Sequence, residues 1–159
     1  MKRFIFLLFV ALLVGLASLV YAGFDEGKAA YDRGDYATAY KEFKPSAEQG
    51  KSEAQYYLGI MYDYGRGVPE DDTEAAKWYC KAAEQGNRFA QLFLGIMYKF
   101  GRGVPQDYVL AYMWLNLAAA QGSSGARIVR DQLALSMTPS QIAEAQRLGT
   151  REWKTKSGY

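Results

Sequence analysis

Residues 54–86 and residues 90–122 are two copies of one segment. The copies align without a gap at a spacing of 36 residues, and 19 of the 33 aligned positions are identical. A spacing of roughly 20 to 50 residues is typical of repeat proteins, in which each repeat buries its apolar face only against its neighbours. The chain is therefore predicted to fold as a stack of repeats, and such stacks usually present a surface to a partner.

The first half of each copy has the apolar spacing of an amphipathic helix. The positions of this stripe are Ala54, Tyr57, Leu58, Met61 and Tyr62 in the first copy, and Ala90, Phe93, Leu94, Met97 and Tyr98 in the second. Gly59 and Gly95 interrupt the two helices at the same place, although glycine inside a helix costs about 1 kcal/mol relative to alanine. We expect a neighbouring helix to approach closely at both glycines.

Each of these helices is followed by the sequence GRGVP, which is expected to end it. The glycines of the two connectors are Gly65, Gly67, Gly101 and Gly103. The first glycine of each connector suits a left-handed helix end, and the proline suits the start of a second helix. Asp71 is predicted to cap that helix with Glu74 completing a capping box, and Asp107 keeps the cap in the second copy. Trp78 and Trp114 are predicted to fill the gaps between repeats.

The two copies are flanked by less regular helical segments. After Gly122 the period is expected to end. A helix is predicted over residues 127–135, and a second helix, capped by Thr138, is predicted to run to about Trp153. The expected organisation is a degenerate helical pair (23–50), two repeats (51–86 and 87–122) and C-terminal capping helices (123–159).

Residues 1–22 have the layout of a secretory signal peptide. Lys2 and Arg3 precede an almost unbroken apolar run, and small residues lead to an expected cleavage after Ala22. The alternative is an uncleaved membrane anchor, because the run is near the lower length limit for crossing a bilayer. Cleavage would leave 17 basic and 17 acidic side chains. Such a balanced chain lacks the positive surface of a nucleic-acid-binding protein.

The sequence contains few groups that are suited to catalysis. Histidine, the commonest general base and metal ligand, is absent. Cys80 is the single cysteine and is predicted to be a small buried apolar residue, with pairing between molecules as the alternative. Glu70, Asp71 and Asp72 could attract a hard cation, but helix capping and exposure to solvent explain them more simply. No catalytic residue, cofactor or metal site is predicted.

The pattern A-x-x-x-L-G-x-x-Y-x-x-G-x-G-V-x-x-D-x-x-x-A-x-x-W-Y/L-x-x-A-A-x-x-G occurs in both copies and resembles the Sel-1-like repeat, a relative of the tetratricopeptide repeat. Leu115 stands where this pattern usually has tyrosine. The resemblance implies an all-α fold, a right-handed superhelix of antiparallel helix pairs with a concave inner face. It also implies an adaptor role, and exported bacterial members of the family are often tied to envelope functions or host contact. A cysteine-rich branch of the family has been linked to β-lactam binding and hydrolysis, but its repeats each carry a disulfide that Cys80 alone cannot form.

By this resemblance, a partner would bind in the concave groove, on the face of each first helix opposite the buried stripe. The predicted binding residues are Glu53, Tyr56, Ile60, Asp63, Phe89, Leu92, Ile96 and Lys99. The copies differ at this face, for example at Asp63 and Lys99. Either binding specificity or drift on a plain surface explains these differences. The mixture of aromatic, aliphatic and charged side chains suits an extended peptide or a partner helix.

The leading functional hypothesis is a non-catalytic protein–protein interaction module, periplasmic or secreted. Its expected partner is a protein or peptide, with no nucleic acid, cofactor or small-molecule substrate. A second hypothesis is an envelope enzyme that hydrolyses β-lactams or peptidoglycan, which the absence of histidine and disulfides disfavours. A third is a membrane-tethered assembly factor, which requires that the N-terminal segment is retained.

Overall fold

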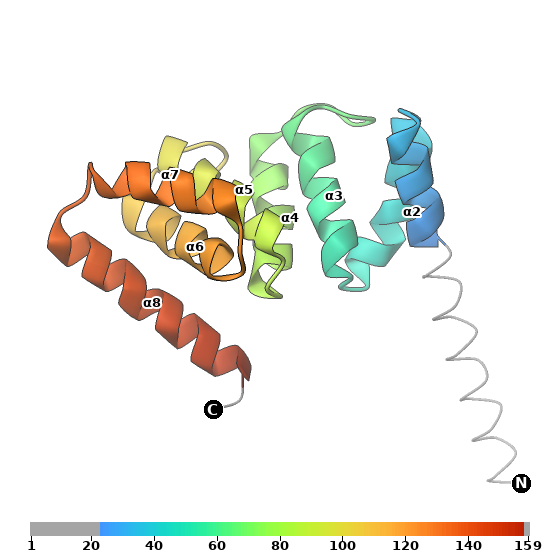
Figure 1. Ribbon diagram of the computed structural model, residues 1–159. Coiled ribbons are helices and arrows are strands. Elements are labelled where there is room, and N and C mark those ends of the chain that lie inside the picture. The colour runs from blue at the N-terminus through green and yellow to red at the C-terminus, as the bar shows by residue number, and fades with distance from the viewer. Residues whose placement is uncertain (1–22, 158–159) are drawn as a thin grey trace, which may run out of the picture.

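The computed structural model describes residues 23–157, and every regular element in this range is a helix (Figure 1). A helical segment over residues 23–32 comes first. It is followed by α2 (Tyr36–Glu48), α3 (Ser52–Asp63), α4 (Asp72–Glu84), α5 (Arg88–Phe100), α6 (Tyr108–Ala120), α7 (Ser124–Ala134) and α8 (Pro139–Ser157). The all-α repeat fold predicted from the sequence is confirmed. The predicted signal peptide lies outside the described residues.

The helices alternate between two positions along a row (Figure 1). The first helices of the successive units are residues 23–32, α3, α5 and α7, and the second helices are α2, α4 and α6. Each first helix from α3 onward packs against the second helix of its own unit and of the preceding unit, except that α7 has only α6. Adjacent first helices also touch, so α3 contacts α5 and α5 contacts α7.

The sequence identity between the units ends at Gly122, as expected, but α7 keeps the spacing of the helix cap and of the buried positions. Ser123 caps α7 through the Ala126 N–H, 36 residues after Asn87 caps α5. Ala126 and Leu133 are buried at the places that Ala90 and Met97 occupy in α5. The helix accordingly begins at Ser124 and not at Arg127. The apolar positions that packing requires are kept here, although the repeat's other identities are lost.

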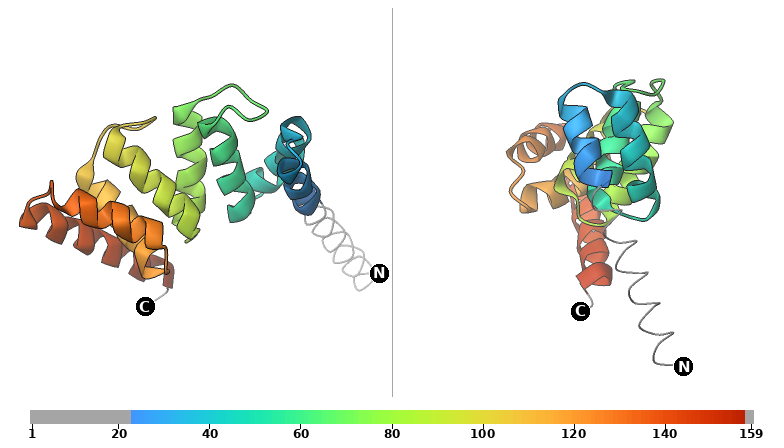
Figure 2. Two further views of the ribbon diagram at one scale, coloured as in Figure 1. Left: turned by 45° about the horizontal axis from the view of Figure 1, so that its top comes forward. Right: turned by 90° about the vertical axis from the view of Figure 1, so that its right-hand side faces the viewer.

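α8 packs against the outer side of α6 (Figure 1) and makes no comparable contact with α7, although α7 and α8 overlap in the left view of Figure 2. It presents Ala145 and Gly149, and Gly149 lies beside Met113 and Leu117 of α6. The outer face of α4 carries Glu74, Lys77 and Lys81, whereas the same positions of α6 carry Leu110, Met113 and Leu117. The cover supplied by α8 therefore explains three of the differences between the copies. It also explains why α6 is apolar on all sides.

The two glycines inside the first helices permit the close approach that was predicted. A Cβ atom at Gly59 would lie 2.5 Å from the ring of Tyr79, and one at Gly95 would lie 2.7 Å from the Leu115 side chain. Gly27 meets Phe43 in the same way in the degenerate unit. A first helix thus packs directly on one large side chain of its second helix in all three units.

The GRGVP connectors both end a helix and join neighbouring units. Gly65 and Gly101 adopt the expected left-handed conformation, with φ of +62° and +68°. The second glycine of each connector also has a positive φ and rests on the backbone at the start of the preceding second helix. A Cβ atom at Gly67 would lie 2.5 Å from the carbonyl oxygen of Tyr36, and one at Gly103 would overlap the carbonyl of Asp72. The sequence did not predict this second role.

The predicted aspartate caps are confirmed, but the capping box is not. Asp71 accepts hydrogen bonds from the N–H groups of Thr73 and Glu74, at 2.9 and 3.0 Å. Asp107 accepts one from Leu110. The Glu74 carboxylate instead pairs with Lys77 at 2.9 Å. The N–H of Asp71, which the capping box would have occupied, donates to a carbonyl oxygen of α3.

The single-residue expectations for the second helices have mixed outcomes. Trp78 and Trp114 are buried as predicted, with exposed fractions of 8% and 6%. Cys80 is half-buried and not fully enclosed, and its Sγ atom lies 3.6 Å from a carboxylate oxygen of Glu84. Position 80 therefore lies at the margin of the larger hydrophobic core, against which its side chain packs.

Candidate partner-binding groove

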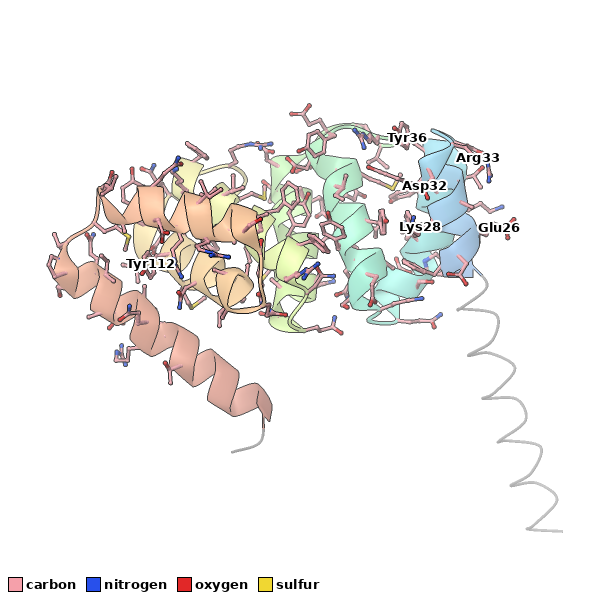
Figure 3. The ribbon with its side chains drawn as sticks, in the orientation of Figure 1. Glu26, Lys28, Asp32, Arg33, Tyr36 and Tyr112 are labelled. Carbon is pink, nitrogen blue, oxygen red and sulfur yellow. The ribbon has the colours of Figure 1, made fainter. Side chains whose placement is uncertain are left out.

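The structure divides the eight predicted binding residues into three groups. Glu53, Tyr56 and Phe89 line one open groove with a volume of about 540 Å³ at the amino ends of α3 and α5. Residues that the sequence reasoning missed complete its lining, namely Phe24, Lys28, Ser52, Tyr57, Gln85, Gly86, Asn87, Arg88 and Gln121. Lys28 comes from the helical segment of residues 23–32, beside α3 (Figure 3). The groove therefore spans three successive units of the stack.

Aromatic side chains form the apolar part of this groove. The rings of Tyr56 and Phe89 are stacked with centroids 5.7 Å apart, and Tyr56 also leans against Tyr79 and Phe93. Phe89 is 46% exposed, so much of its ring is open to the groove. Burial raises the pKa of Tyr56 to about 12, with a smaller effect from neighbouring tyrosines such as Tyr57. Tyr56 therefore offers a ring and a protonated hydroxyl, and its hydroxyl stays protonated to a higher pH than that of an exposed tyrosine.

Charged side chains of both signs stand at the rim. The Lys28 ammonium pairs with Asp32 at 2.7 Å. The Arg88 guanidinium lies over the Phe89 ring at 4.7 Å, and no described carboxylate lies within ion-pair distance of it. Glu53 accepts a hydrogen bond from the Ser52 hydroxyl at 3.3 Å. An incoming polypeptide would therefore meet an apolar floor with one unpaired cation and one carboxylate beside it.

Ile60 and Asp63 are not available to a partner, which corrects their assignment to the binding face. Their exposed fractions are only 8% and 5%. The Asp63 carboxylate accepts a hydrogen bond from the Tyr79 hydroxyl at 3.1 Å and pairs with Arg102 at 2.6 Å. Arg102 also pairs with Asp72 at 2.6 Å, and its hydrogen bonds to the two carboxylates raise the pKa of the guanidinium. These contacts form a clamp between the second connector and the preceding unit.

The clamp explains why the two copies differ at this position. In the second copy Lys99 replaces Asp63 and Leu115 replaces Tyr79, so the carboxylate and its hydroxyl donor are lost together. No third GRGVP connector exists whose arginine would need an acceptor. The difference between Asp63 and Lys99, which the sequence left open between specificity and drift, therefore follows from packing.

Leu92, Ile96 and Lys99 lie on the partly exposed face of α5, outside the groove lining. Leu92 lies beside Gly125 in the first turn of α7, so the next first helix partly covers it. The Lys99 ammonium lies over the ring of Phe100, at 5.0 Å. Their role in binding stays a prediction.

The two copies match the Sel1 repeat over residues 52–87 and 88–123. Both copies are Sel1 repeats. A solved Sel1-like structure, the protective antigen c5321 of uropathogenic Escherichia coli, is 31% identical and superposes with a TM-score of 0.79 over 84% of this chain and 29% of that one. The DAP3-binding cell death enhancer 1 of Rattus norvegicus is 43% identical over 26% of this chain and 8% of its own length. The exopolysaccharide production negative regulator of Rhizobium meliloti (strain 1021) is 39% identical over 37% of this chain and 22% of its length. The chain thus spans less than a third of each of these relatives.

A ladder of glutamines joins successive Sel1 repeats beneath the groove. Gln55 donates to the carbonyl oxygen of Ala47 at 3.0 Å and accepts from Gln85 at 2.7 Å. Gln91 and Gln121 repeat the arrangement one unit later, at 3.1 and 2.8 Å. Gln85 and Gln121 also line the groove. Sequence reasoning missed this ladder, although the identity of both glutamines in the two copies was a signal for it.

Two further observations concern the chemistry of the described part of the chain. Among the side chains of residues 23–150, no three carboxylate or cysteine groups converge at a point where they could hold a metal ion. Over residues 23–157, no helix combines the length and the apolar character needed to cross a bilayer.

Proposed function

We propose that this chain is a non-catalytic protein-binding module of the bacterial cell envelope, and that a peptide or helix of its partner binds in the groove between residues 23–32, α3 and α5. Sel1 repeat proteins typically bind protein partners. The observation that carries the assignment of the site is the exposed Phe89 ring stacked on Tyr56 in an open groove. The DAP3-binding relative supports a role in protein binding. The exopolysaccharide regulator is a bacterial protein and supports a role in a bacterium.

The chemistry of the groove favours a polypeptide as the ligand. Aromatic residues and arginine contribute more to binding energy than other residues do at protein interfaces, and the groove combines Tyr56 and Phe89 with Arg88. The groove is open, whereas small-molecule sites enclose most of their ligand. Burial raises the pKa of Tyr56 to about 12, so its hydroxyl stays protonated and serves as a contact group. These properties support recognition without turnover.

Replacing Phe89 with alanine is expected to weaken partner binding by about thirtyfold, which corresponds to about 2 kcal/mol for an exposed aromatic contact at the centre of an interface. A photo-crosslinking side chain at position 53, inside the groove, would report binding in cells. Phe100→Ala is the matched control, because Phe100 is 60% exposed and lies outside the groove lining. Equal crosslinking yields in the two alanine variants, or no crosslinked partner, would contradict the proposed site.

The proposed envelope location rests on residues 1–22 and predicts a processed chain. Intact-mass measurement of the protein recovered from the periplasm or the medium should give an amino terminus at Gly23, because the segment before it has the layout of a signal peptide. Recovery of the chain in the membrane fraction with Met1 intact would instead support the membrane-tethered assembly factor.

A further inference from the structure

The two GRGVP connectors hold their arginines in different ways. In the second connector, the Arg102 guanidinium lies 2.6 Å from carboxylate oxygens of Asp63 and Asp72. In the first connector, the Arg66 guanidinium donates a hydrogen bond to the Tyr31 hydroxyl. Among the side chains of residues 23–150, no carboxylate lies within ion-pair distance of Arg66. The first connector therefore carries a positive charge of the kind that the second connector neutralises within the chain.

Tyr31 stands at the position that Asp63 holds in the next unit. Gly27 meets the large side chain of its second helix as Gly59 does, so the two glycines are equivalent. Tyr31 follows Gly27 by four residues, just as Asp63 follows Gly59. Both side chains accept a hydrogen bond from the arginine of the connector that follows the next first helix. A hydroxyl has thus taken the place of a carboxylate.

Tyr36 stands at the position of the second carboxylate, which belongs to Asp72. Each of these two residues directly follows the aspartate that caps its helix, Asp35 for α2 and Asp71 for α4. The second glycine of a connector rests on the backbone carbonyl of each one. Figure 3 shows Tyr36 beside the loop that joins α3 to α4. Tyrosines therefore replace both anionic partners of the clamp at the first connector.

Aromatic rings surround the Arg66 guanidinium without neutralising it. Its central carbon lies 5.6, 5.4 and 5.2 Å from the ring centroids of Tyr31, Tyr36 and Tyr64. Such rings attract a cation through their π faces but carry no net charge. The hydrogen bond to Tyr31 uses Nη1, whereas a guanidinium has five N–H donors in a planar fork that matches a carboxylate. Arg66 is partly exposed and Tyr64 is 54% exposed, so an anionic group can approach the guanidinium from solvent.

We propose that the Arg66 site, formed by Arg66, Tyr31, Tyr36 and Tyr64, binds a carboxylate from an acidic segment of a partner protein. The second connector shows which chemistry pairs with this arginine, because its partners there are carboxylates. Arginine and tyrosine are also enriched among the residues that dominate the energy of protein interfaces.

The Arg66 site is separate from the groove. The groove lies at the amino end of α3, and the connector follows the carboxyl end of the same helix. The two sites are therefore about 18 Å apart, which is the length of a 12-residue helix. A partner that reaches both would place an apolar segment in the groove and an acidic segment on Arg66.

An NMR titration of the isotope-labelled chain with a tetraglutamate peptide, blocked at both ends, tests the proposal. We expect the Nε–H signal of Arg66 and the amide signals of residues 65–68 to shift. Arg66→Gln should weaken binding by about tenfold or more, because it removes the charge-assisted pair. Arg127→Gln is the matched control, since it removes an exposed arginine from α7 and should leave the affinity unchanged. Equal weakening in both variants, or no shift near Arg66, would overturn the proposal.

Tyr36→Asp tests the Arg66 site while the arginine is kept. The new aspartate recreates the carboxylate that Asp72 supplies in the second clamp, so it should pair with Arg66 and weaken peptide binding by about tenfold. Tyr36→Phe should bind like the parent. A Tyr36→Asp chain that binds as tightly as Tyr36→Phe would contradict the assigned site. Circular dichroism shows whether each variant is folded, and Arg66→Gln decides the question if Tyr36→Asp is not.

A titration with inorganic phosphate checks the chemical class of the ligand. Phosphate at the same concentration should shift the signals near Arg66 less than the peptide does, and equal or larger shifts would overturn the assignment to an acidic polypeptide. None of these variants alters the groove, so the results are independent of the proposed function.

Discussion

Replacing Gly103 with alanine is expected to destabilise the fold by about 3 kcal/mol or more, the largest effect of any glycine substitution in the connectors. Gly103 has a φ of +65°, a conformation that alanine adopts only with strain. In addition, a Cβ atom would overlap the carbonyl of Asp72, which is backbone at the start of α4 and cannot rotate away. The second connector would have to separate from the preceding unit, and the Arg102 clamp would be disturbed with it.

Gly122→Ala provides the control for this effect. Gly122 has a φ of +86°, but a Cβ atom there would meet nothing within 4 Å. Only the conformational strain applies, so a loss of about 1 kcal/mol is expected. Urea unfolding followed by circular dichroism measures both changes. If the two variants lost equal stability, the connector would be acting only as a turn and not as a contact between units.

Replacing Asp63 with alanine is expected to destabilise the fold by about 2 kcal/mol. The change leaves the Tyr79 hydroxyl buried without its acceptor and removes one of the two carboxylates that hold Arg102. We expect less than the usual loss for a broken buried ion pair, because the Arg102 side chain is 41% exposed and keeps Asp72.

Lys99→Ala is the matched control, since Lys99 holds the same position in the second copy and lies partly exposed over Phe100. Its stability should change by no more than about 0.5 kcal/mol. Thermal unfolding of both variants gives the comparison. Adding Tyr79→Phe to Asp63→Ala should recover part of the loss, because the orphaned hydroxyl is then removed. Additive losses in the double variant would contradict the hydrogen bond as the source of the effect.

The sequence predicted what depends on neighbouring residues. The apolar stripes, the aspartate caps and the left-handed glycines Gly65 and Gly101 follow from local spacing and backbone preference, and the structure confirms them. Even the close approach at Gly59 was predictable, because an unfavourable residue at the same place in both copies calls for a packing reason.

What the sequence did not predict depends on contacts between units. Asp63 was assigned to the binding face by helical spacing, but Arg102, 39 residues later, covers it. The groove forms where three units meet. Phe24 of the first unit and Gln121 of the third unit both line it, and no single repeat contains both residues. The phase of α7 was missed because only its buried positions follow the repeat. Spacing identifies which side of a helix is buried in its own unit, but not which neighbours reach the other side.

The cover that α8 places on α6 limits how an array of this kind can lengthen. The first copy keeps a polar outer surface at Glu74, Lys77 and Lys81, so a further unit of its type can be inserted before residue 88 and still face water. The second copy has exchanged that surface for Leu110, Met113 and Leu117, and it functions only as the terminal unit. Growth or shortening by whole units, in evolution or by engineering, is therefore confined to the amino-terminal side of the last repeat.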